Sequence, residues 1–474
     1  MNFLNNDFFG FTNNSSKKNS TLFVVDDLSR LVKSKIITQK EKSYIIENYK
    51  NADVFTKPDF VKDVLLSITV LKPSTVHRYS TIDNSAKISK KLKNRTWNIE
   101  FSTSFSETDI YDFLIGWGLS FYKFSFNKNK DNKKLLNLKS LKSFPIRLQD
   151  HCKTELKGIF LARNLINLPA NMLNPSEYEK IIKKNFKNKN IHIKTYKGNN
   201  FKSQFPLIYT VGRSSEYQPR LIEINWKSKK NNPNIIIIGK GITFDTGGLD
   251  IKPSSGMLLM KKDMGGSAVA IALTKILIEL NFKINLKLLV PIAENAISEK
   301  SMRPMDVVFS RNKTPVEIGN TDAEGRLILA DTITFAQEGE TKVDLIIDFA
   351  TLTGAARVAL GTEMPALFSN NKKIAKTILD NSLKKNDPLW ELPLFNSYQR
   401  FLKNENGTLS STGFSGTGGA ITAALFLQKF LKNNVNWVHV DMMGWNLTDR
   451  PGYPKGGEAS SIRALLYALN ELFN

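Results

Sequence analysis

The second part of the chain alternates between short, continuously apolar runs and longer runs with helical spacing. Ile235–Ile238 and Leu345–Ile347 are apolar without interruption, which is typical of strands covered on both faces. Gly265–Leu280 and Ala420–Leu431 are long enough for helices and lie between predicted strands. The remaining predicted strands are Ile191–Tyr196, Leu221–Trp226, Leu286–Pro291, Val343–Phe349 and Trp437–Asp441, and the remaining helices are Glu177–Phe186, Ala330–Glu338 and Ser460–Phe473. This alternation predicts an α/β fold with a mixed, mainly parallel sheet flanked by helices.

The first part of the chain has a smaller set of α/β elements. Its predicted strands are Ser20–Val25 and Thr96–Phe101, and its predicted helices are Lys40–Tyr49, Pro58–Leu71 and Ser106–Phe121. The basic polar stretch Asn127–Lys142 predicts a linker or exposed loop. A helix from Leu148 to Leu165 is expected to join the two parts. We therefore expect a smaller N-terminal α/β domain over residues 1–145 and a larger domain over residues 146–474 that begins with this helix.

Polar loops follow several of the predicted strands, where the functional residues of such sheets collect. In the run Ile318–Leu327, Asp322 and Glu324 are separated by one residue, so in an extended segment both carboxylates point the same way. Like charges held this close repel each other unless a cation lies between them or one is protonated. A metal ion is the simplest resolution, whereas an isolated pair of this kind is ordinarily a solvated turn.

Two further loops supply the rest of a polar constellation. The loop after Ile235–Ile238 contains Lys240 and Asp245, and the segments that follow contain Lys252 and Asp263. Together with the first pair, this makes four carboxylates, which is the natural ligand set for two divalent ions with one bridging carboxylate.

Other catalytic chemistries lack the residues that they need. The four histidines are His77, His151, His192 and His439, which are far apart and form no His-Glu-x-x-His motif, so a histidine-rich zinc protease site is excluded. No Gly-x-Ser-x-Gly motif accompanies a suitable His and Asp, and the sequence Gly-Lys-Gly at 239–241 does not extend into a phosphate-binding loop. Each histidine is predicted to be structural or on the surface.

Several collinear motifs resemble those of the leucine aminopeptidase (cytosol aminopeptidase) family. The most specific is NTDAEGRL at 320–327, and the others are NLINLPAN at 164–171, GKGITFDTGG at 239–248, IKP at 251–253, MKKDM at 260–264 and ATLTGA at 350–355. The resemblance covers about residues 150–474. It implies that residues 146–474 form the catalytic domain of a two-metal aminopeptidase that acts on peptides and assembles as a homohexamer.

The resemblance also implies which residues bind the metal ions. Asp245 and Glu324 would bridge two divalent ions, either Mn²⁺ or Zn²⁺. Lys240 and Asp263 would complete the more loosely held site, and Asp322 the other. A lysine ligand must be neutral, so Lys240 requires a strongly lowered pKa, which two nearby dications would supply.

Catalytic and substrate-binding residues follow from the same resemblance. The two ions would lower the pKa of a bridging water, and the resulting hydroxide would attack the first peptide bond. Lys252 would stabilise the carbonyl oxygen, and Arg326 would hold a bicarbonate ion as general base. The first substrate residue is expected to carry an apolar, Leu-like side chain. The pocket for it is expected to be lined by Met260, Asn320, Thr351, Leu352 and Gly354.

The charge and cysteine content add expectations about partners and location. The formal net charge of +23 is spread along a chain rich in Asn, Ile and Lys, which indicates compositional bias, so nucleic-acid binding remains open but is not expected. No apolar run approaches the roughly 20 residues that span a bilayer, so no membrane partner is expected. Met1–Asn19 does not have the pattern of a secretory signal, and the single cysteine, Cys152, suits a reducing cytoplasm.

Two alternatives remain open at this point. The first is a polyanion- or DNA-binding protein on the same fold, which the net charge motivates. The second is a metallopeptidase that accepts only dipeptides, since the motifs do not fix the length of the substrate.

Overall fold

The fold is that of a computed structural model, which describes most of the chain. The described residues are 8–14, 16, 18–59, 64–71, 79–127, 134–142, 144–188, 190–229, 231–339, 341–413 and 416–473. His77 and residues 128–133 of the predicted linker lie outside these ranges. No helix in the described ranges combines the length and the apolar character needed to cross a bilayer.

The chain divides into two compact units. One comprises Met1–Phe160 with Thr448–Lys455, and the other comprises Leu161–Leu447 with Gly456–Asn474. The division falls inside helix α5 (Ile146–Asn167). The boundary predicted from the sequence lies at the first residue of this helix. The boundary between residues 145 and 146 stays a prediction.

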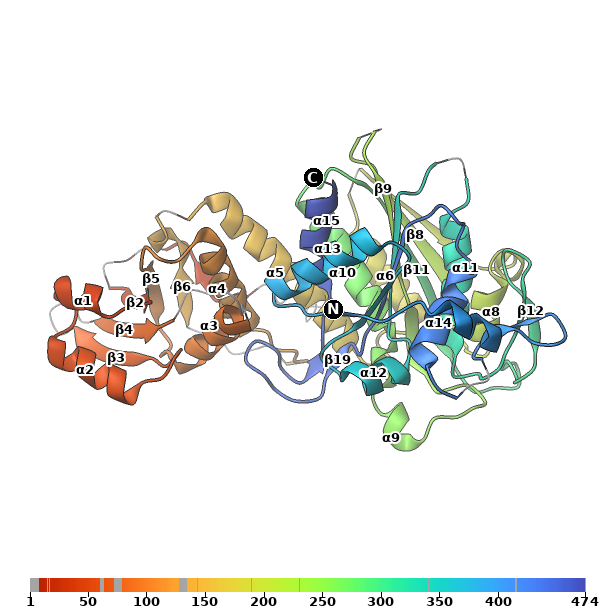
Figure 1. Cartoon of the computed structure of the whole chain (residues 1–474), viewed down its shortest axis with the longest axis horizontal. Helices are drawn as coiled ribbons and strands as arrows, with labels where there is room; N and C mark the ends of the chain where they lie inside the picture. The colour runs from red at the N-terminus through yellow and green to blue at the C-terminus, as the bar shows by residue number, and fades with distance from the viewer. Residues whose placement is uncertain are drawn as a thin grey trace. The chain divides into compact units, whose positions relative to one another are not determined.

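The first unit contains a six-stranded sheet in the order β1-β6-β5-β2-β4-β3, in which only β3 and β4 pair antiparallel (Figure 1). Helices α1 and α2 pack on it through a cluster of apolar side chains that includes Phe23, Leu31, Ile45 and Ile68. Its strands are β1 Phe11–Thr12, β2 Ser20–Val25, β3 Phe55–Asp59, β4 Val64–Val70, β5 Thr96–Phe101 and β6 Leu135–Asn137. Its helices are α1 Ser29–Lys33, α2 Gln39–Asn48, α3 Tyr79–Lys91, η2 Leu138–Ser140 and α4 Glu107–Leu119.

Two predictions for this unit are wrong. The described part of the predicted linker Asn127–Lys142 contains strand β6 and helix η2, and its residues Leu136 and Leu138 are buried. The segment Pro58–Leu71 was predicted to be a helix, but its described residues 58–59 and 64–70 belong to β3 and β4. The β-branched residues of Val64–Val70 favour a strand, and β4 pairs with neighbours on both sides. Pro58 is tolerated because β3 is an edge strand, where a missing N–H need not break a ladder.

The second unit contains a nine-stranded mixed sheet in the order β16-β15-β18-β14-β9-β11-β8-β7, with β10 paired to β11. The central strands β18, β14, β9, β11 and β10 run parallel. The pairs β7–β8, β8–β11 and β15–β18 are antiparallel, and the edge strand β16 pairs parallel with β15. The predicted mainly parallel sheet is therefore confirmed. The strands are β7 Ile191–Tyr196, β8 Arg220–Trp226, β9 Asn234–Gly239, β10 Gly241–Asp245, β11 Asn285–Asn295, β14 Leu345–Ala350, β15 Ala366–Ser369, β16 Trp390–Glu391 and β18 Trp437–Asp441.

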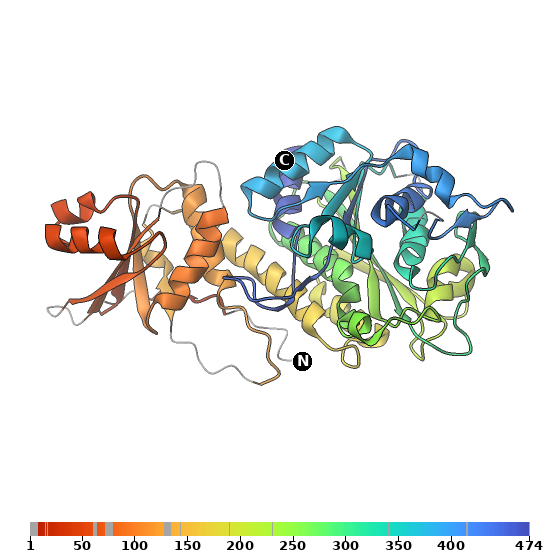
Figure 2. The same cartoon turned by 60° about the horizontal axis from the view of Figure 1, so that its bottom comes forward.

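Helices cover both faces of this sheet (Figures 1 and 2). On one face, α8, α11 and α14 pack against side chains such as Ile236, Ile238 and Ile346. On the other face, α10 lies against β9 and β14 and also contacts α15. The helices are α6 Pro175–Asn185, α7 Phe201–Gln204, α8 Pro206–Gly212, α9 Ser254–Met257, η3 Met260–Met264, α10 Gly265–Glu279, α11 Glu324–Ala336, α12 Gly354–Leu360, α13 Lys372–Lys384, η4 Asn396–Leu402, α14 Gly419–Gln428 and α15 Ile462–Phe473.

Two small sheets lie beside the main one. Their strands are β12 Val307–Phe309, β13 Pro315–Glu317 and β17 Leu409–Ser410 in one, and β19 Trp445–Asn446 and β20 Gly456–Gly457 in the other.

The register of the central strands brings their carboxyl ends to one edge. Phe349 of β14 pairs with Gly239 of β9, and Ala350 pairs with Asp441 of β18. The loops that leave these strands therefore start side by side, which is where the ligand-binding loops of open α/β sheets lie.

Candidate active site

The predicted acidic and basic residues gather at this carboxyl edge of the sheet. Lys240 stands between β9 and β10, and Asp245 is the last residue of β10. Asp263 lies in η3, the short 3-10 helix that leads into α10. Asp322 and Glu324 arrive from the loop before α11 and from its first residue.

The local conformation of the last pair differs from the predicted one. Asp322 lies in a turn, in which its backbone N–H donates to Asn320 Oδ1 at 2.7 Å, and Glu324 begins α11. The predictions that the pair lies on an extended segment and that this helix begins at Ala330 are therefore wrong. A carboxylate is favoured in the first turn of a helix, where the free N–H groups are electropositive.

Three carboxylates form a compact group. Asp245, Asp322 and Glu324 each offer an oxygen, and these oxygens all lie within 4.8 Å of one another. Asp245 and Glu324 are almost completely buried, whereas Asp322 is half-buried. Buried carboxylates this close need positive charge among them.

Two lysines supply positive charge from the protein itself. Lys240 Nζ lies 2.7 Å from Asp263 Oδ2 and 2.8 Å from Glu324 Oε1. Lys252 Nζ lies 2.9 Å from Asp245 Oδ2 and also pairs with Asp322. Each lysine therefore joins two carboxylates, and the fourth acidic residue, Asp263, is linked to the group through Lys240.

The protein groups alone leave the carboxylates incompletely compensated. Burial, together with the charge of Asp263, raises the pKa of Asp245 to about 6. Burial and the charge of Asp245 raise the pKa of Glu324 well above its usual range. Asp263 is the exception, because Lys240 outweighs the effect of burial and its pKa is lowered.

Lys240 has a raised pKa in this arrangement of protein groups. Burial by itself lowers the pKa of its ammonium, but the charges of Asp263, Glu324 and Asp245 outweigh that effect. A lysine can bind a metal ion only as a neutral amine. The lowered pKa that this requires would therefore have to come from dications bound beside Lys240.

The donor set suits hard divalent cations. Asp263 Oδ2 and Glu324 Oε1 are buried, and among the described residues the Lys240 ammonium is the polar group that lies against both. Buried carboxylate oxygens are ordinarily hydrogen-bonded or bound to a metal. The four carboxylates and the amine of Lys240 therefore fit two divalent ions.

Arg326 lies in the first turns of α11 and is mostly buried. Its Nη1 donates to the carbonyl oxygen of Ser411 at 2.7 Å, while its Nε is buried and makes no hydrogen bond with the described residues. Burial lowers the pKa of the guanidinium to about 10, so it remains charged at neutral pH. An anion is the chemistry that this unused donor fits.

All the predicted site residues line one cavity of about 490 Å³. The residues predicted to contact the first substrate residue also position the metal-site residues. Thr351 Oγ1 donates to Asp263 Oδ1 at 2.7 Å, and the carbonyl oxygen of Thr351 accepts from Lys240. Met260, Leu352 and Gly354 complete that wall of the cavity. The structure thus brings the predicted residues together, and their individual roles stay predictions.

Three positioning residues carry no signal in the sequence. Asn295 Nδ2 donates to Asp245 Oδ1 at 2.8 Å, and the Asp250 carboxylate accepts from the backbone N–H of Thr321 at 2.7 Å. Asp441 accepts from the backbone N–H of Leu352 at 2.9 Å. These side chains tie the loops to one another, which only the folded chain reveals.

Two further basic residues line the cavity without having been predicted. Lys262 lies in the quoted motif MKKDM but had no assigned role, and Arg357 lies on α12. Lys262 is 1% exposed, and burial lowers its pKa to about 8.

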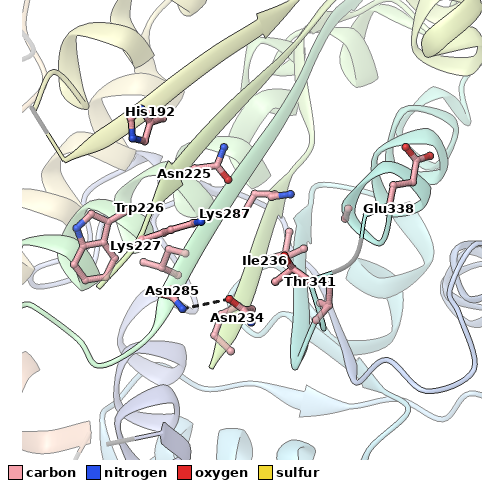
Figure 3. A pocket seen from close by; sticks show the side chains of 14 residues that line it. His192, Asn225, Trp226, Lys227, Asn234, Ile236, Asn285, Lys287, Glu338 and Thr341 are labelled. Carbon is pink, nitrogen blue, oxygen red and sulfur yellow. Dashed lines mark hydrogen bonds between the residues drawn. The ribbon is translucent and has the colours of Figure 1, made fainter. Parts of the chain in front are cut away.

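A second cavity, of about 380 Å³, lies at the opposite edge of the sheet, near the first residues of β9 and β11 (Figure 3). Its lining includes His192, Asn225, Lys287 and Glu338, and Asn285 Nδ2 donates to Asn234 Oδ1 at 3.3 Å. Only one carboxylate belongs to this lining, so it does not resemble a metal site.

Comparison with known proteins agrees with this geometry. Residues 160–466 match the family model described as "Cytosol aminopeptidase family, catalytic domain". A probable cytosol aminopeptidase of Chlamydia abortus is 38% identical over 325 residues, which are 67% of this chain and 64% of that protein. A probable cytosol aminopeptidase of Chlamydia caviae is 34% identical over 407 residues, which are 82% of this chain and 81% of that protein. The match to the first of these relatives thus spans slightly less than two thirds of its length.

Solved structures extend the similarity over nearly the whole chain. The crystal structure of a cytosol aminopeptidase from Coxiella burnetii superposes with a TM-score of 0.88 and 35% identity, and covers 98% of this chain and 99% of that one. The bottromycin maturation enzyme BotP in complex with Mn superposes with a TM-score of 0.83 and 25% identity, and covers 96% and 99%.

Proposed function

The chain belongs to the cytosol aminopeptidase family, and from that premise we propose that it is a metal-dependent aminopeptidase that releases the first residue of peptides. The observation that carries this proposal is the group of carboxylates from Asp245, Asp322 and Glu324, whose oxygens lie within 4.8 Å in an open cavity. Residues 146–474 would form its catalytic domain.

We propose that two divalent ions, Mn²⁺ or Zn²⁺, bind at this group of carboxylates. Asp245 and Glu324 would bridge them, Lys240 and Asp263 would complete one site, and Asp322 would complete the other. When bound, the ions would supply Lewis-acid chemistry that makes a water nucleophilic near neutral pH.

Two cationic side chains would act on the substrate and on the proton. Lys252, half-enclosed beside Asp245 and Asp322, would hold its ammonium toward the carbonyl oxygen of the scissile bond and stabilise the charge that develops there. Arg326 would hold a bicarbonate ion as proton acceptor, which its buried, unbonded Nε supports.

The substrates would be peptides with a free N-terminus. Met260 and Leu352 support a pocket with an apolar wall, which would accept a Leu-like first residue. A dipeptide-only enzyme is the alternative, and relative rates on dipeptides and tetrapeptides with the same first residue distinguish the two.

A homohexamer in the cytoplasm belongs to the same proposal. Large apolar side chains of the second unit are exposed, namely Leu258, Met305, Phe309 and Val358. Exposed apolar side chains are the groups that protein–protein contacts cover. The single cysteine, Cys152, is buried, and a chain with one cysteine forms no internal disulfide, as suits a reducing compartment.

Hydrolysis of Leu-p-nitroanilide after loading with Mn²⁺ or Zn²⁺ tests the proposal. We expect activity that a chelator abolishes and that Asp245→Ala and Glu324→Ala each lower by about 10³-fold or more, because each variant removes a bridging ligand. Asp380→Ala is the matched control, since this exposed carboxylate on α13 pairs with Lys376 and lies outside the lining of the active-site cavity. Full activity in either site variant, or indifference to chelators, would contradict the proposal.

A further inference from the structure

Lys262 is a buried cation that the mechanism above does not use. Lys262 lines the active-site cavity and is 1% exposed. Among the described residues, no group forms a hydrogen bond or an ion pair with its Nζ, whereas Lys240 and Lys252 in the same cavity each pair with two carboxylates. A buried charge without a partner is costly, so the site favours an anion supplied from outside.

The neighbouring Lys261 has a different environment from Lys262. Lys261 Nζ donates to the carbonyl oxygen of Asn167 at 2.8 Å and lies over the ring of Trp445. Lys261 is therefore used in packing outside the cavity, while the next residue along η3 faces into it.

Arg357 adds a second cation to the same wall. Its Nη2 stands 3.5 Å from the position that a Cβ on Gly354 would occupy, so the guanidinium lies beside a residue predicted to contact the substrate. Its hydrogen bond in the described structure goes to the sulfur of Met443, at 3.5 Å, which is a weak acceptor. Arg357 and Lys262 line the same cavity.

These two cations arise from the segments that form the pocket for the first substrate residue. Met260 and Lys262 lie on η3, and Leu352, Gly354 and Arg357 lie on the loop and first turn of α12. The pocket therefore combines an apolar wall with a basic one. Three carboxylates of the metal group come from other segments, β10, the loop before α11 and its first residue, and the fourth, Asp263, directly follows Lys262 on η3.

We propose that this pocket selects an acidic first residue, with glutamate as the best fit. The aliphatic stem of glutamate would pack on Met260 and Leu352, and its carboxylate would pair with Lys262 and Arg357. Arginine and lysine together give a carboxylate charge-assisted hydrogen bonds that no neutral side chain can match. This inference rests on the proposed aminopeptidase activity and names its preferred substrate class.

A leucine side chain would still enter the pocket along its apolar wall but would leave both cations unpaired. Glutamine has the size and shape of glutamate without its charge, so the ratio of the two isolates the electrostatic contribution. A site built to pair a polar group discriminates strongly against the analogue that lacks it.

The test compares kcat/KM for Glu-, Gln- and Leu-p-nitroanilide with the metal-loaded full chain. We expect Glu to exceed Gln by about 10-fold or more, and Lys262→Met to reduce that ratio by about 10-fold or more. Lys261→Met removes the same charge one residue earlier and should keep the ratio. Arg357→Gln, on a partly exposed side chain, is a second variant should Lys262→Met fail to fold, and should also lower the ratio.

The anilides carry no C-terminal carboxylate, so the preference for Glu has to come from the side chain. The C-terminus of a peptide is the other source of a carboxylate. Repeating the comparison with Glu-Ala, Gln-Ala and their C-terminal amides distinguishes the two sources. A Glu-to-Gln ratio near one with the wild-type chain, or an equal loss on all substrates in Lys262→Met, overturns the inference. So does a rate advantage that follows the C-terminal carboxylate alone. Turnover of Leu-p-nitroanilide without selectivity for Glu refutes only this inference, whereas no turnover of any substrate refutes the aminopeptidase proposal.

Discussion

At the scale of single residues, the site consists of charges that compensate one another in pairs. Lys240 lies between Asp263 and Glu324, and Lys252 lies between Asp245 and Asp322. The chain makes room for Lys240 by placing Gly325 next to it, because a Cβ there would stand 2.6 Å from Lys240 Cε. Burial and the neighbouring carboxylates raise the pKa values of Asp245 and Glu324 in spite of the two lysines.

The two lysines are expected to respond differently to mutation. Lys252→Ala should lower kcat by about 10²–10³-fold and leave the metal content per subunit unchanged, because it removes an oxyanion donor and no ligand. Elemental analysis of the purified protein and steady-state kinetics measure the two effects. Lys229→Ala, on an exposed lysine, is the control. Loss of metal in Lys252→Ala would show that its role is misassigned.

At the scale of elements, the site depends on how closely α10 approaches the sheet. Gly239, at the end of β9, leaves no room for a side chain, because a Cβ there would lie 2.3 Å from Ser267 Cα. Gly266 is equally tight, since a Cβ would lie 2.2 Å from the carbonyl oxygen of Phe349. This contact holds η3, and with it Asp263 and Lys262, against the ends of β9 and β14.

Gly266→Ala is expected to destabilise the fold through this contact. The added methyl meets backbone atoms that cannot rotate away, so we expect a loss of about 1–3 kcal/mol in the free energy of unfolding. Gly256→Ala on α9 is the matched control, because the nearest atom to its Cβ would be 3.6 Å away, and its effect should stay within about 0.5 kcal/mol. Urea unfolding of both variants measures the difference. Equal stabilities would contradict the close packing described here.

At the scale of the whole molecule, the sheet of the second unit accounts for the position of the site. The parallel strands β9, β14, β18 and β11 end at one edge, and loops from widely separated parts of the sequence meet there. The positive charge is not localised in this way, because the excess of +23 is spread along the chain. In the cavity itself, some basic residues lie beside the carboxylates, and others line one wall of the substrate pocket.

A chain with this charge distribution is not expected to bind duplex DNA. Binding to a polyanion requires basic side chains gathered on one surface, and its affinity falls steeply with salt. A mobility-shift assay with duplex DNA at low salt should show no shift at micromolar protein. A shift that disappears with increasing salt would instead support the polyanion-binding alternative.

Much of the second unit could be predicted from local pattern. Strands such as Ile235–Ile238 and helices such as Gly265–Leu280 were recognisable because burial on both faces leaves a continuous apolar signature. The segment Pro58–Leu71 was mistaken for a helix, since its length and apolar content fit either element and pairing with β2 decides the outcome. The start of α11 was missed for a related reason, because the acidic and glycine residues of its first turn carry no apolar periodicity.

The sequence by itself determined the chemical groups of the site, which are four carboxylates, two lysines and an arginine. Their spacing within each motif is fixed by the covalent chain, so it can be recognised without a structure. Only the tertiary structure decided how they pair, because Lys240 meets Asp263 and Glu324 across long stretches of chain that the sheet brings together. It also decided which of two adjacent lysines faces the cavity, since Lys261 is held by Asn167 and Lys262 is not. That choice depends on packing across elements, which no local pattern encodes.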